Sequence, residues 1–148
     1  METGLLHLHN ILRWVILLLL LVVIIQALAK KSGITKTSLW LMIAAHTTLL
    51  LGVYQWFTSD KAGLAILKNM DNDFGAVMKN SFARFWVVEH FAGMLIAIIF
   101  ITIARGKAKA LNYKAAAWLY ILALLIILVV IPWPFRELIG RPWFPGIK

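Results

Sequence analysis

The chain has 148 residues, of which 62% are hydrophobic and 14% are charged. Soluble domains carry roughly a quarter charged residues, so a water-soluble core of this length cannot absorb so much apolar surface. The sequence contains no cysteine, which excludes disulfides, thiolate metal sites and haem attached covalently through cysteine. These properties predict an all-α integral membrane protein with a single domain over residues 1–148.

Four apolar stretches predict helices at about residues 8–29, 38–58, 83–104 and 114–135, with a long outer loop over residues 59–82. Each stretch approaches the roughly 20 residues that a helix needs to span about 30 Å of hydrocarbon. The first has no basic residue before it and is followed by Lys30 and Lys31, so we interpret it as a retained helix and not as a signal peptide. The pattern predicts a four-helix membrane bundle.

The charges predict the orientation of this bundle. The two short loops, residues 29–38 and 105–114, contain no acidic residue and the following basic ones: Lys30, Lys31, Lys36, Arg105, Lys107, Lys109 and Lys114. Such loops face the cytoplasm, so both termini and the outer loop should lie on the non-cytoplasmic side of a bacterial inner membrane. The net charge of +9 is then explained by topology and anionic lipid, and no nucleic-acid partner is expected.

The tryptophans form two predicted interfacial belts. Counted at ~1.5 Å per residue from the short loops, Trp56, Trp86 and Trp133 lie about 27 Å up, while Trp40 and Trp118 lie within about 5 Å of the start. Pro132 and Pro134 should end or kink the last helix at the outer interface. One short interfacial helix, weakened by Gly75, is predicted from apolar residues at nearly helical spacing: Leu64, Leu67, Met70, Phe74 and Met78.

Ionisable residues within the predicted helices are the candidates for chemistry, because facing lipid would cost each of them several kcal/mol. Arg13 and Glu89 lie at about 24 Å and about 22 Å on the same count, so we expect them to pair and to place the first helix beside the third. This pair could contribute to a functional centre, or it could only fix the register of two helices.

The histidines suggest a haem site. His46, His90 and His9 lie at about 12, 21 and 30 Å, with His7 near the outer entrance of the first helix. Imidazoles from two facing helices are the usual ligands of b-type haem in a bundle, and both His46 with His90 and His9 with His90 are candidate pairs. The four histidines would suffice for two haems, and each could instead be a hydrogen-bonded packing residue.

Two further features are compatible with haem. The small residue Gly93 follows His90 by three positions and could make room for a macrocycle, or could equally allow close helix packing. The haem propionates would find cations near the outer interface in Arg13, Arg84 and Arg136.

Four segments, His7–Trp14, His46–Gly52, Val88–His90 and Ile131–Pro134, resemble those of small four-helix membrane proteins of Bacteroidetes-type bacteria that are often labelled cytochrome b. The resemblance covers nearly the whole chain. It implies that one functional centre contains His9, Arg13, His46, Glu89 and His90. It does not identify the ligand.

The sequence therefore favours a membrane-embedded b-type haem protein that transfers electrons, as a quinone-linked oxidoreductase or an electron-transfer subunit. Its partners would be the quinone pool and a redox protein near the outer surface. The first alternative is a haem-free copper, zinc or proton pathway through His7, His9, Glu89 and His90. The second is a structural accessory subunit of a larger complex, or a homo-oligomer, in which Arg13 and Glu89 only lock helices together.

Overall fold

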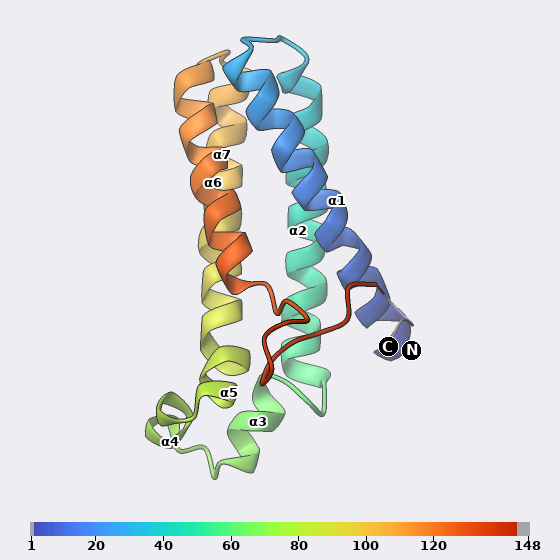
Figure 1. Ribbon diagram of the computed structural model, residues 1–148, viewed down its shortest axis with the longest axis vertical. Helices are drawn as coiled ribbons and strands as arrows, with labels where there is room; N and C mark the ends of the chain where they lie inside the picture. Colours follow the sequence, from blue (N-terminus) through green and yellow to red (C-terminus); the bar gives the residue numbers. More distant parts are fainter. Residues whose placement is uncertain (1, 145–148) are drawn as a thin grey trace.

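The computed structural model describes residues 2–144, and it contains four long helices with shorter ones between the second and the third (Figure 1). The long helices are α1 (Glu2–Leu28), α2 (Ile34–Thr58), α6 (His90–Lys109) and α7 (Tyr113–Val130). The third is extended at its start by α5 (Ser81–Arg84) and the π-helix η1 (Phe85–Glu89). Four helical spans are long and apolar enough to cross a membrane, which confirms the predicted multi-pass helical protein.

The helices form a bundle in which α1 and α6 each pack against both α2 and α7. Because they share both neighbours, α1 and α6 lie diagonally across the bundle, and the prediction that the first helix lies beside the third is wrong. One end of the bundle, the loop end, holds the start of α1, the helices α3 to α5 and residues 131–144 (Figure 1). The opposite end, the turn end, holds the two short connections.

Small side chains allow the helices to approach closely in the half of the bundle nearer the turn end. No side-chain surface is exposed at Ala104, Ala108, Ala116 and Ala123, and the same is true of the larger Ile101. Helix association in lipid depends on such van der Waals packing, because lipid tails are as apolar as leucine. Many large apolar side chains are exposed on the outward faces of the helices, as expected of a surface that contacts a bilayer.

Both connections at the turn end are tight and use the same geometry. Lys30 and Leu111 have φ values of 52° and 55°, in the left-handed region. The following residues donate backbone hydrogen bonds five positions back, from Lys31 to Gln26 at 2.8 Å and from Asn112 to Lys107 at 2.9 Å. This is the Schellman ending of a helix, formed here without glycine. It lets the chain reverse direction within a few residues.

The outer loop contains two short helices, α3 (Leu64–Asn69) and α4 (Phe74–Lys79), where the sequence predicts one. The interruption comes from Asp71 and Asn72, whose φ values of 55° and 57° are left-handed and incompatible with a continuing helix. Asp73 then starts α4, since its side chain accepts a hydrogen bond from the Ala76 amide at 3.0 Å. Gly75 lies inside α4 and does not interrupt it.

The last long helix ends at Val130, five residues before the predicted end. Pro132 disfavours helical geometry at the residue before it, and Ile131 accordingly has an extended ψ of 133°. Residues 131–144 then fold as an irregular segment, which we call the C-terminal strap. The strap turns sharply at Gly140, where a Cβ atom would lie within 2.8–2.9 Å of three backbone carbonyl oxygens.

Candidate functional site

The structure brings His9 and His90 together inside the loop end of the bundle. His9 lies on α1 and His90 is the first residue of α6, so the two imidazoles meet across the diagonal of the bundle. Their ring centroids are 6.5 Å apart and their planes are inclined by 57°. Of the two histidine pairs that the sequence leaves open, the structure assembles this one.

The orientation of His90 is fixed by a backbone carbonyl. Its Nδ1 lies 2.7 Å from the carbonyl oxygen of Val130, the last residue of α7. A carbonyl oxygen can only accept, so Nδ1 must carry the proton, and the neutral ring then has its free lone pair on Nε2. Histidines that bind metals are usually held in this way, with the other ring nitrogen donating to a carbonyl or carboxylate.

The hydrogen bond of His90 also satisfies a backbone carbonyl at the end of α7. The last carbonyls of a helix lack partners within it. The Leu128 carbonyl accepts from the Trp133 indole at 2.8 Å, and the Val129 carbonyl accepts from Arg136 at 3.1 Å. His90 is the partner of a third carbonyl at this helix end, that of Val130, and the hydrogen bond therefore also joins α6 to α7.

His9 is held by close packing and has fewer polar contacts. A Cβ atom on Gly52 of α2 would lie 3.3 Å from the Cε1 atom of His9, so the glycine gives the ring its space. The Nδ1 atom of His9 is buried and has no hydrogen-bond partner among the described residues. A buried imidazole nitrogen without a partner is costly unless another group satisfies it, which marks this ring as a candidate ligand.

Glu89 pairs with Arg84 and not with Arg13, so the predicted ion pair is wrong. The Nε atom of Arg84 donates to Oε1 of Glu89 at 2.6 Å, and both side chains are more than a third exposed. The reason is η1, since the wider π-helical turn brings residues five apart toward the same side of the helix, whereas in an α-helix they point about 140° apart. The π-helix thus turns Glu89 toward Arg84 and leaves His90 facing the bundle.

Arg13 instead attaches the C-terminal strap to α1. Its guanidinium donates to the carbonyl oxygens of Trp143 at 2.8 Å and Pro142 at 3.4 Å. The indole of Trp14 donates to the same Trp143 oxygen at 2.9 Å, and its ring stacks on those of Trp143 and Phe144. The strap therefore crosses the loop end from α7 to α1 (Figure 1).

His46 lies apart from this pair. It is exposed on α2, and its Nδ1 bonds to the Met42 carbonyl of its own helix at 2.8 Å. His46 precedes Gly52 by six residues, so it lies about 9 Å nearer the turn end and points roughly 120° away from the Gly52 face. His7 is half-buried, two residues before His9, and points about 160° away from it around α1.

Aromatic rings complete the surroundings of His90. The rings of Phe85 and Trp86 lie with their centroids 5.8 Å from the His90 ring. Each aromatic ring in turn carries a cation on its outer side, Arg136 at 4.9 Å from the Phe85 centroid and Arg141 at 4.7 Å from that of Trp86. From the sequence, Trp86 is predicted only to lie in an interfacial belt. Its place beside His90 depends on the π-helix, which has no recognisable sequence signal.

Two observations limit what the site can hold. Among residues 2–144 there is no group of three or more histidine, aspartate or glutamate side chains that could bind a metal ion. A Cβ atom on Gly93 would lie 2.5 Å from a methyl group of Val130, so this glycine allows α6 and α7 to pack closely and leaves no space for a ligand.

No protein-family model, curated protein or solved structure matches this chain.

Proposed function

We propose that this protein is a membrane-embedded b-type haem protein that transfers electrons, with His9 and His90 as its axial ligands. The observation that carries the proposal is the approach of these two rings, 6.5 Å apart, from helices on opposite corners of the bundle. Imidazole nitrogens bind metals at about 2 Å, so two rings at this spacing are close to what one metal atom between them requires.

The presence of two histidines as the available protein ligands favours haem over a metal ion held by protein side chains alone. A zinc or copper ion held by protein alone needs about four ligands, and the structure offers two histidines here, because Glu89 is occupied by Arg84. Haem supplies four equatorial nitrogens itself, so two imidazoles complete its coordination. When bound, the haem iron would supply the one-electron redox chemistry, and the protein would supply its ligands, orientation and dry surroundings.

The residues around the pair suit this role. The Val130 carbonyl holds His90 in the tautomer with a free lone pair on Nε2. The centroid of the His9 ring, whose buried Nδ1 has no partner among the described residues, lies 6.5 Å from that of His90. Trp86 contacts His90 on one side and borders the loop-end surface on the other, which would give an aromatic route toward a redox partner. A lipid-soluble carrier such as quinone would exchange electrons from the membrane side.

The same proposal includes an orientation. The turn end carries the acid-free basic loops and would face the cytoplasm, while the loop end would lie on the outer side of a bacterial inner membrane. Single-cysteine labelling of intact cells tests it. A membrane-impermeant reagent should reach position 72 and not positions 32 and 112, and the reverse pattern would invert the topology.

The haem content of histidine variants tests the function itself. His9→Ala and His90→Ala should each lose most of the bound haem, measured as pyridine haemochrome per mole of purified protein. His46→Ala is the matched control, because the same change is made on an exposed ring of the neighbouring helix. His7→Ala provides a second control at the outer end of α1. Equal haem in all four variants, or a wild type purified without haem from haem-replete cells, would refute the assignment.

A further inference from the structure

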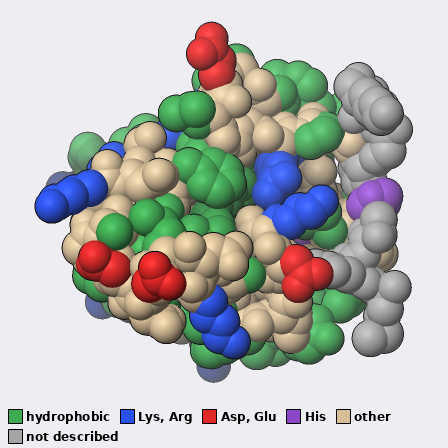
Figure 2. Space-filling model, turned by 90° about the horizontal axis from the view of Figure 1, so that it is seen from below, with side chains coloured by type: hydrophobic (Ala, Val, Ile, Leu, Met, Phe, Trp, Pro, Cys, Tyr) green, Lys and Arg blue, Asp and Glu red, His purple; other side chains and the backbone are tan. Residues whose placement is uncertain are grey.

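A pocket of about 340 Å³ opens at the loop end, separate from the space between the two histidines. Figure 2 looks onto this end and shows a hollow of hydrophobic side chains beside a cluster of basic ones. Figure 2 is viewed along the bundle axis, so the pocket opens at the end of the bundle, which would face water in the proposed topology. Its lining includes Lys61, Ile66, Phe82, Trp86, Ile139 and Arg141.

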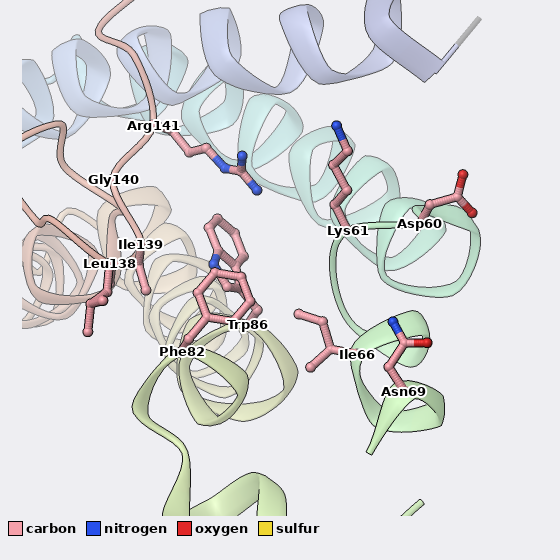
Figure 3. Close-up of a pocket in the computed structure, with 10 residues that line it drawn as sticks. All are labelled: Asp60, Lys61, Ile66, Asn69, Phe82, Trp86, Leu138, Ile139, Gly140 and Arg141. Carbon is pink, nitrogen blue, oxygen red and sulfur yellow. The ribbon is translucent and has the colours of Figure 1, made fainter. Parts of the chain in front are cut away.

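Arg141 is the cation at the centre of this pocket. Figure 3 shows its guanidinium extending from the strap over the ring of Trp86, at 4.7 Å from the ring centroid. No described carboxylate lies within ion-pair distance of it, and burial lowers the pKa of Arg141 from its ordinary value. A partly desolvated arginine without an acidic partner is a favourable place for an anion, which it can hold through two parallel hydrogen bonds.

Other groups in the pocket support the same ligand chemistry. The indole Nε1 of Trp86, whose side chain lines the pocket, is buried and has no hydrogen-bond partner among the described residues. Lys61 adds a second cation across the pocket, whereas the Asp60 carboxylate lies on the far side from Arg141 and points outward (Figure 3). Apolar walls from Phe82, Ile139 and the Trp86 ring would cover the uncharged part of a ligand.

We infer that this pocket binds a small water-borne organic anion, a carboxylate with a flat apolar body, whose charged group contacts Arg141 and whose body lies against Phe82, Ile139 and the edge of the Trp86 ring. The inference does not depend on haem, because it rests on the pocket and its cations alone. The pocket does border the proposed redox centre, since the other side of the Trp86 ring contacts His90.

Fluorine NMR titration of the detergent-purified protein with 4-fluorobenzoate tests this inference. The neutral isostere 4-fluorobenzamide should bind at least about tenfold more weakly, because it lacks the charge that strengthens hydrogen bonds to arginine. Arg141→Gln should weaken 4-fluorobenzoate binding by about tenfold or more, and Lys68→Gln, an exposed basic residue of the same end outside the pocket, should leave it unchanged. Equal affinities for 4-fluorobenzoate and 4-fluorobenzamide would overturn the inference.

Two further arms keep the test decisive. Arg141→Lys retains the positive charge but cannot donate two parallel hydrogen bonds to a carboxylate, so it should also weaken 4-fluorobenzoate binding. It takes the place of Arg141→Gln if the glutamine variant does not fold. Wild-type affinity in the folded arginine variants would overturn the inference. A short-chain phosphatidylglycerol that displaces the probe more effectively than free benzoate would identify a lipid headgroup site and overturn the water-borne assignment.

Discussion

The two halves of the bundle differ in what their interiors contain. Toward the turn end, the helices meet through fully buried aliphatic and alanine side chains such as Leu20, Ile101 and Ala104. Toward the loop end, they meet through histidine, arginine and tryptophan side chains, and an irregular strap packs across them. The difference indicates that one half mainly stabilises the fold, while the other uses that stability to hold polar groups where they would otherwise be costly.

The largest stability loss should come from the half near the turn end. Ile101→Ala removes a side chain with no exposed surface and leaves a cavity between helices, which should cost about 3 kcal/mol of unfolding free energy. Thermal unfolding in detergent, followed by circular dichroism, measures this. Haem per folded molecule should stay at the wild-type level, and a loss of haem without loss of stability would contradict the division between the two halves.

The next effect should come from the strap. Arg13→Gln removes a charged donor from the carbonyls of Trp143 and Pro142, at a cost of about 2 kcal/mol. The strap should then detach from α1, so limited proteolysis should release a C-terminal tag several-fold faster than in the wild type. Lys68→Gln on the same end is the control for a lost positive charge. Unchanged proteolysis would show that Arg13 does not hold the strap.

A smaller effect is expected from a substitution at Gly52 of α2, because the absence of a side chain there gives the His9 ring its space. A valine there would push the ring away, since even a Cβ atom would lie 3.3 Å from it. We expect haem affinity to fall by about tenfold, or about 1.4 kcal/mol, with little change in unfolding temperature. Haem titration of the apoprotein measures the affinity, and Gly106→Val, in open space near the turn end, is the matched control. Wild-type affinity in Gly52→Val would place His9 outside the cofactor site.

The smallest effect concerns the ion pairs. Arg84 and Glu89 are partly exposed, so a double-mutant cycle should show a coupling of only about 0.5–1 kcal/mol in unfolding free energy. The corresponding cycle for Arg13 and Glu89 should be additive. Coupling in the second cycle and none in the first would mean that η1 does not turn Glu89 as described.

The sequence is sufficient to predict the four helices that could span a membrane, because hydrophobic length and loop charge are local properties of the chain. It is insufficient for the diagonal placement of α1 and α6, since counting heights along helices gives no information about which helices are neighbours. Arg13 and Glu89 illustrate this, because they lie at similar heights but bind different partners. The five-residue π-helix before His90 also has no signal in composition or spacing, although it decides where Trp86 and Glu89 point.

The proline-containing segment after α7 shows a second limit. Pro132 and Pro134 correctly predict that the last helix stops in this region, since proline restricts the residue before it. They do not predict that the chain returns across the bundle to Arg13 and Trp14. That contact uses backbone carbonyls of Pro142 and Trp143 as acceptors, and carbonyls are present at every residue, so no side-chain pattern reveals it.

Low-temperature EPR of the oxidised protein tests the central claim most directly, because it reports the axial ligands of a ferric haem. We expect a low-spin signal of the kind given by two imidazole ligands, lost or converted to high spin in His9→Ala and His90→Ala and unchanged in His46→Ala. A low-spin signal that persists in His9→Ala, or one that disappears in His46→Ala, would contradict the His9 and His90 pair as the centre of this protein.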